Sequence, residues 1–290
     1  MNKKLIGSLF LTLSALIYGS FGLISRFIGS FEPFTQSWIK STFILIILVS
    51  IMVVGKIRFK KIERKDVKWF ALWILPASFQ PVLSFLAFNH LPVGMTYFFS
   101  YSTMVLGGII SGKIFFSEKM DSSKIVSIFL LLFGMLLIYG TDLNLVKNIY
   151  VIFILLAGMI LGFWNTLTKK VSGNYSEYQM LIMDGSTALV LCLFASIIFG
   201  EKTMSVGNIT PWIWIFVYAL LAVLASVFLI KGFRNVEAQA GSLILPMEIV
   251  FGTLFGYLFL GEIMNTKVYI GGLLILIAAI LPVIKKKLRF

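Results

Sequence analysis

Three charged side chains interrupt long apolar stretches of this chain. Glu248 lies about ten residues into the stretch 238–260, which in a helix rising 1.5 Å per residue is about 15 Å deep. A charge inside hydrocarbon is costly and marks a partner or a function. Because burial favours the neutral form of a carboxyl group, such a residue suits reversible protonation or cation binding. The alternative is a structural partner for a polar group of a neighbouring helix.

Lys40 and Asp184 form a second candidate pair, separated by 144 residues. Each lies about seven residues, or about 10 Å, into its own apolar stretch. We hypothesise that they respond to opposite gates or bind the two ends of a zwitterionic substrate. The alternative is two separate shallow charges that reach water or the headgroups by snorkelling.

Polar residues also occur in the middle of other apolar stretches. Gln80 lies between Pro76 and Pro81, which remove backbone donors and bend a helix, so that Gln80 either lines a substrate path or binds a freed carbonyl. The residues predicted to line a cavity are Gln80, Tyr97, Tyr101, Trp164, Asn165 and Glu248. The candidates for ion coupling or gating are Glu248, Lys40 and Asp184.

Glycines share a helix face with these candidates. Gly108 and Gly112 follow Tyr97 and Tyr101 at helical spacing, and Gly252 and Gly256 follow Glu248 in the same way. Small residues let helices approach closely. We therefore expect the stretches 91–115 and 238–260 to pack on each other, with the two tyrosines and Glu248 flanking a cavity.

The elements that must position these residues are ten apolar stretches. About 20 apolar residues of helix cross a hydrocarbon layer about 30 Å thick. The stretches are continuously apolar rather than alternating, which favours helices over a barrel. Hydrophobic residues make up 59% of the chain and charged ones 13%, which excludes an ordinary soluble domain. The predicted spans are 5–25, 33–54, 69–89, 91–115, 124–140, 148–168, 178–199, 210–232, 238–260 and 267–284.

The distribution of basic residues predicts the orientation. With the N-terminus in the cytoplasm, nineteen of the 25 Lys and Arg residues fall in cytoplasmic segments and four fall on the other side. This asymmetry predicts ten spanning helices with both termini cytoplasmic. It also accounts for the net charge of +13 without a nucleic-acid partner.

The chain repeats itself at a shift of about 144 residues. Residues 116–121 fall on residues 260–265, with Glu118 on Glu262, and at a shift of 143 Arg26 falls on Lys169. We predict two five-helix repeats, 1–140 and 141–290. Because five is odd, the second repeat enters the membrane inverted, a common construction of secondary transporters.

Enzyme signatures are missing from the sequence. It contains no HExxH, P-loop or GxSxG pattern, and its single cysteine, Cys192, has no zinc-type spacing. We therefore expect no enzyme, no metal and no cofactor, and any active transport would depend on an ion gradient.

The chain resembles the EamA family of the drug/metabolite transporter superfamily in three features. These are ten helices in two halves, Tyr18-Gly19 in the first helix, and Leu260-Gly261-Glu262 with its counterpart Ser117-Glu118. Family members often carry a proline in the fourth and ninth helices; here Pro246 is present but Ser102 stands at the other position. The resemblance implies a multi-pass protein of the cytoplasmic membrane that transports small metabolites, often amino acids.

The expected function is secondary active transport of a small organic metabolite, as an exporter, by alternating access. The expected partners are that substrate, the lipid bilayer, and a coupling proton or cation, and the sequence leaves a homodimer open. The alternatives are a multidrug proton antiporter for organic cations and a membrane protein that does not transport.

Overall fold

The computed structural model describes residues 3–28, 31–91, 93–140, 148–202 and 208–284. Two parts of the charge count, Lys147 and the basic cluster 285–289, lie outside these ranges. All regular elements in the described part are helices. They are α1 (Lys3–Gly19), α2 (Phe21–Ile28), α3 (Pro33–Val54), α4 (Arg64–His90), α5 (Val93–Phe116), α6 (Ser122–Tyr139), α7 (Ile149–Val171), α8 (Glu177–Ile198), α9 (Thr210–Asn235), α10 (Ala238–Ile244), α11 (Met247–Leu260) and α12 (Thr266–Ile284).

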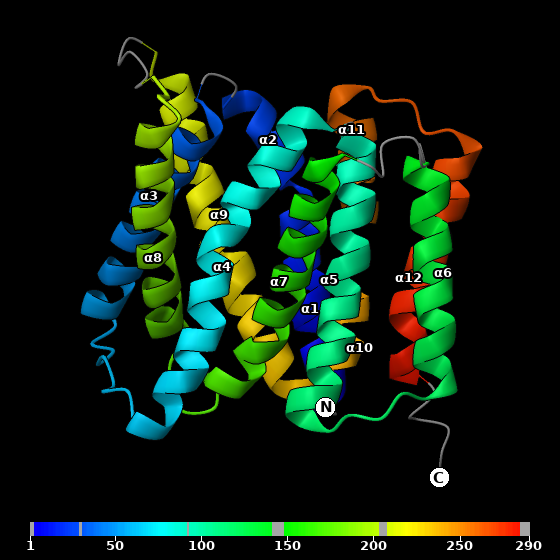
Figure 1. Ribbon diagram of the computed structural model, residues 1–290, viewed down its shortest axis with the longest axis horizontal. Coiled ribbons are helices and arrows are strands. Elements are labelled where there is room, and N and C mark those ends of the chain that lie inside the picture. Colours follow the sequence, from blue (N-terminus) through cyan, green and yellow to red (C-terminus); the bar gives the residue numbers. More distant parts are fainter. Residues whose placement is uncertain (1–2, 29–30, 92, 141–147, 203–207, 285–290) are drawn as a thin grey trace.

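Ten of the described segments are long and apolar enough to cross a membrane, with α1–α2 and α10–α11 each counting as one. The predicted all-α, ten-helix fold is confirmed, and the span limits agree within five residues. The helix α1 begins and α12 ends at the lower face of the bundle in Figure 1. Because α1 runs upward and α7 runs downward, the second set of five spans is inverted relative to the first (Figure 1).

The two halves pack through equivalent contacts. Gly19 of α1 approaches the backbone of Glu248 and Gly252 in α11, so that an added Cβ would lie 2.9 Å from an atom of each. Gly162 of α7 approaches the backbone of Met104 and Gly108 in α5 in the same way, and these two residues lie 144 positions before Glu248 and Gly252. The packing of α1 on α9 has its counterpart in the packing of α7 on α4. The remaining equivalent helices contact each other, α3 with α8 and α6 with α12.

The expected continuous ninth helix, 238–260, is wrong in one respect. The span breaks between Ile244 and Met247, and Pro246 begins α11 as its N-cap. Proline has no N–H to donate and its ring clashes with the carbonyl four residues earlier. The equivalent helix α5 carries Ser102 at this position and stays unbroken, with the Ser102 hydroxyl donating to Phe98 O at 2.6 Å.

The expected glycine contact between the fourth and ninth spans is only half right. Gly108 and Gly112 of α5 do pack on the ninth span, against α10. Gly252 instead faces α1, and Gly256 lies beneath Glu262 in the following turn. The break at Pro246 allows α10 to follow α5 while α11 follows α1.

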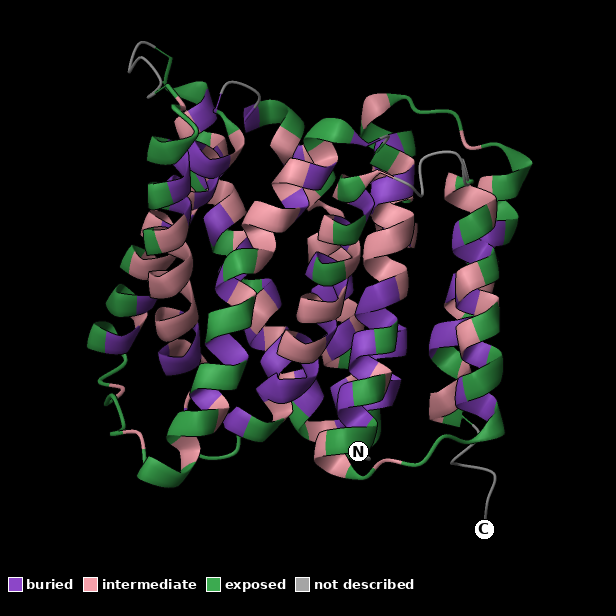
Figure 2. Ribbon diagram, viewed as in Figure 1, coloured by how far each residue is buried: buried purple, intermediate pink, exposed green. Residues whose placement is uncertain are grey.

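Burial is uneven along the bundle. All seven residues of α10 are buried, and the lower parts of α5, α7 and α9 are buried around it. Figure 2 shows this buried region near the lower face, with half-buried positions above it and exposed ones on the outer helices. The exposed outer positions are large and apolar, among them Val53, Phe129 and Ile197. This pattern suits contact with lipid outside and tight closure below.

Candidate functional site

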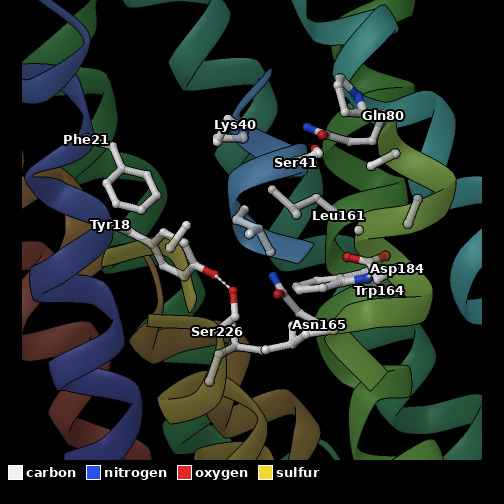
Figure 3. Close-up of a pocket in the computed structure, with 18 of the residues that line it drawn as sticks. Tyr18, Phe21, Lys40, Ser41, Gln80, Leu161, Trp164, Asn165, Asp184 and Ser226 are labelled. Atoms are coloured by element: carbon white, nitrogen blue, oxygen red, sulfur yellow. Dashed lines mark hydrogen bonds between the residues drawn. The ribbon is translucent and has the colours of Figure 1, made fainter. Parts of the chain in front are cut away.

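A cavity of about 320 Å³ lies between the two halves of the bundle (Figure 3). Its wall carries three charged groups, several amides and hydroxyls, and aromatic rings. Its polar and aromatic lining residues are Tyr18, Phe21, Lys40, Ser41, Gln80, Trp164, Asn165, Asp184, Tyr218, Ser226 and Glu248. A volume of this size is at the lower end of the range of small-molecule sites.

Lys40 and Asp184 lie on α3 and α8, which are packed side by side. The Lys40 ammonium is 5.2 Å from the centre of the Tyr218 ring, within the range of a cation–π contact. Asp184 accepts a hydrogen bond from the Trp164 indole Nε1 at 3.1 Å, and the two charges attract each other. Within the described residues neither makes an ion pair, so both remain available to a ligand.

Glu248 lies in the first turn of α11, just after the break at Pro246. The N-terminus of a helix favours a carboxylate because its N–H groups point outward. The Tyr101 hydroxyl of α5 donates a hydrogen bond to Glu248 Oε1. Behind this bond, Tyr97 stacks on Tyr101 and on Tyr139, with ring centres 6.1 and 5.9 Å apart. The carboxylate therefore faces the cavity from a helix break and is held by an aromatic stack.

Asn165 is only 3% exposed, and among the described residues its Oδ1 has no hydrogen-bond partner. A buried polar atom without a partner costs about 1–3 kcal/mol. The amide nitrogen of Gln80 donates to Ser84 Oγ at 2.9 Å, a side chain rather than a backbone carbonyl freed by a proline. Tyr18 of α1 and Ser226 of the neighbouring α9 share a hydrogen bond of 2.9 Å in the cavity wall (Figure 3).

Stacked indoles close the cavity below. The rings of Trp73 and Trp164 lie 5.8 Å apart and almost parallel, at 12°. The Trp73 Nε1 donates to Trp164 O at 3.1 Å and to Thr168 Oγ1 at 3.0 Å. An apolar cluster that includes Phe70, with Val227 and Ile230 of α9, continues this layer toward the lower face.

Most of the residues predicted for the site line the one cavity. They are Lys40, Gln80, Trp164, Asn165, Asp184 and Glu248. Tyr97 and Tyr101 lie behind Glu248 and are not among the described lining residues. Their functional roles stay predictions.

Five polar or aromatic residues of this site were not predicted from the sequence. Tyr18 was recognised only as part of a family motif, while Phe21, Ser41, Tyr218 and Ser226 gave no charge or spacing signal. Aromatic residues are frequent in all ten spans, so only the packing distinguishes those that face the cavity. No group of three His, Cys, Asp or Glu side chains in the described part of the chain could hold a metal ion.

Ten spanning helices in two inverted halves around a polar cavity define a membrane protein of transporter type. The sequence matches the EamA-like transporter family twice, over residues 5–140 and 148–284. The chain belongs to the EamA family. A solved crystal structure, titled only as that of a protein, matches with a TM-score of 0.83 and 13% identity over 98% of this chain and 99% of that one. At that identity it shows the shared fold alone, and no curated protein matches significantly in sequence.

Proposed function

We propose that the protein is a secondary active transporter that exports a small amphipathic metabolite with amino-acid-like charged ends. The supporting observation is that Lys40, Asp184 and Glu248 face one cavity between the halves and, in the described residues, form no ion pair. Unpaired charges within a membrane protein mark a substrate or ion path. A carboxylate and an ammonium group of the substrate would complete them.

The aromatic wall sets the character of the rest of the substrate. Tyr18, Phe21 and Tyr218 form one side, with the Phe21 and Tyr218 ring centres 4.1 Å apart. Such a wall binds an apolar or aromatic group by its surface. An amino-acid-like solute with an apolar side chain satisfies both the charged and the apolar parts of the cavity.

Glu248 is the proposed coupling residue. A proton on this carboxyl would remove a charge that stabilises the bond from Tyr101, a contact that joins the first half to the second. Proton binding and release would therefore change how α5 holds α11. The lower face is proposed to be cytoplasmic, because the basic segment Lys56–Lys68, the start of α1 and the end of α12 are on that side.

A second candidate function is export of organic cations in exchange for protons. Two carboxylates, Asp184 and Glu248, face the cavity against one lysine, and aromatic rings bind cations through their faces. In this case Lys40 would repel the substrate, and its removal would improve binding.

The test uses purified protein in liposomes that enclose a pH-sensitive dye. An amino-acid panel and the lipophilic cation tetraphenylphosphonium are added separately, and solute uptake and proton flux are measured. Uptake of a zwitterion with coupled proton flux supports the leading proposal, and uptake of the cation alone supports the second. Absence of both in protein that remains folded would refute transport.

A further inference from the structure

The repeat places a glutamate in equivalent turns at opposite faces. Glu118 follows α5 at the lower face, and Glu262 follows α11 at the upper face (Figure 1). The preceding residues, Ser117 and Gly261, have left-handed backbones with φ of 52° and 67°. Each glutamate N–H donates to the carbonyl of the glycine six residues earlier, at 3.1 and 3.2 Å. The chain forms one turn twice, so the two carboxylates are structural counterparts.

The lower glutamate ties the two halves together. Glu118 is on the first-half turn, and its side chain is 8% exposed. It accepts hydrogen bonds from the first N–H groups of α10, those of Ala238 at 2.7 Å and Gln239 at 2.9 Å. It also pairs with the Lys169 ammonium of α7 at 3.4 Å. One carboxylate therefore holds two helices of the second half at the lower face.

A buried lysine reinforces this lower contact. Lys124, at the start of α6, donates to Gln239 Oε1 at 2.7 Å and pairs with Glu237 Oε2 at 2.9 Å. Its side chain is 5% exposed. These bonds fix the first turn of α10 against the first half, in agreement with the tight packing of this face.

The upper glutamate has the ion pair but lacks the helix cap. Glu262 pairs with Arg26 of α2 at 2.6 Å, and the side chains are 46% and 61% exposed. Arg26 is the counterpart of Lys169 at the shift of 143 residues. At the shift of 144 residues, Ala238 and Gln239, whose N–H groups are capped in α10, correspond to Gly94 and Met95 in the first turn of α5. Within the described residues Glu262 has no side-chain partner except Arg26.

We propose that Glu118 and Glu262 are alternating latches, and that this structure has the lower latch closed and the upper latch open. In the opposite state, Glu118 leaves α10 and Glu262 caps the first turn of α5 at Gly94 and Met95. In each state one carboxylate caps one helix, so the exchange replaces one set of cap hydrogen bonds with the other. This inference rests on the proposed alternating-access function.

The test measures from which face the cavity is accessible. Cys192→Ser removes the single cysteine, and Ala188→Cys places a reporter on the cavity wall. Protein is reconstituted in liposomes of known orientation, and a membrane-impermeant maleimide is added at one face at a time. We expect the reporter to react mainly from the upper face. Glu118→Gln keeps one acceptor oxygen but loses the charge and one of the two cap hydrogen bonds, and it should raise the reaction rate from the lower face by about tenfold.

Two variants separate the latch from a general structural effect. Glu177→Gln also removes a lower-face glutamate in an ion pair, with Arg234 at 2.6 Å, and should leave the sidedness unchanged. The double variant Glu118→Lys/Lys169→Glu restores an ion pair between these positions but not the helix cap. Its reporter cysteine should therefore still react with maleimide added at the lower face. An unchanged sidedness in folded Glu118→Gln protein overturns the proposal.

Two further readouts keep the outcomes distinct. If the reporter background still transports while Glu118→Gln leaves the sidedness unchanged, the latch is wrong and the proposed function stands. If the reporter protein does not transport, and the reporter cysteine reacts from the lower face in none of the variants, both the latch and the proposed function are wrong. Should Glu118→Gln not fold, hydrogen exchange of the unaltered protein in nanodiscs replaces it. The amides of Gln239 and Gly94 should change in opposite directions when a transported solute is added, and parallel changes overturn the latch.

Discussion

Asp184→Asn offers a direct test of how the cavity recognises charge. Asp184 uses one carboxylate oxygen to accept the Trp164 indole N–H at 3.1 Å, which leaves the other for a substrate ammonium group. An asparagine can still accept from Trp164, so the substitution removes the charge and keeps the local shape. A hydrogen bond to a charged group contributes about 1.5–3 kcal/mol. The loss corresponds to binding about 10- to 150-fold weaker.

The assay compares three related ligands. Leucine has both charged ends, 3-methylbutylamine lacks the carboxylate, and 4-methylpentanoate lacks the amine; each is titrated by thermal stabilisation, because a ligand of the native state raises its apparent stability. Asp184→Asn should weaken binding of leucine and the amine but not of the acid. Lys40→Met should weaken binding of leucine and the acid but not of the amine.

A neighbouring residue of α8 supplies the control. Thr187→Val is on the same helix, and the Thr187 hydroxyl bonds to Asp184 O at 2.8 Å within that helix, so its replacement should leave all three affinities unchanged. Equal losses for amine and acid in Asp184→Asn protein would refute the assignment of ligand ends. Tighter amine binding in Lys40→Met protein would support the organic-cation function.

Three further predictions concern coupling, the helix break and a helix cap. Tyr101→Phe removes the hydrogen bond to Glu248 and should shift the pH dependence of uptake without loss of folding, measured by proton flux in liposomes. Pro246→Ala should join α10 to α11, leave the melting temperature equal or higher, and reduce uptake at least tenfold. Asp121→Ala should lower the free energy of unfolding by about 1 kcal/mol. Partial burial raises the pKa of Asp121, but hydrogen bonds from the first turn of α6 lower it, and the net pKa is below the ordinary value of 3.8. The stabilisation by this cap is therefore fully present above pH 3.8 and is lost as the pH falls through the lowered pKa.

The fold was predictable from the sequence because hydrocarbon imposes length and polarity on each span. The ten spans and their inversion follow from apolar length and from an odd number of spans per repeat. The break in the ninth span was missed, although Pro246 was visible. A proline can also bend a continuous helix, and only the packing of α10 on α5 and of α11 on α1 separates the two outcomes.

The charged part of the site was predictable, while its aromatic part was not. Lys40 and Asp184 stand out because charges are rare in apolar spans, and their spacing of 144 relates them through the repeat. Tyr218 and Phe21 have no such signal, because aromatic residues face lipid, core and cavity alike. Asn165 was identifiable as a polar residue within a span, but its unpartnered oxygen depends on three-dimensional contacts.

In the proposed transport cycle, the two inverted halves open one cavity alternately to the two faces. Pulsed electron paramagnetic resonance tests this proposal with spin labels at Lys119 and Asn235 across the lower contact of Glu118 with α10, and at Asn89 and Ile263 across the upper face, near the start of α5 and the turn of Glu262. We predict that a transported solute lengthens the lower distance and shortens the upper one. Distances that stay fixed, or that change in the same direction at both faces, would contradict the account.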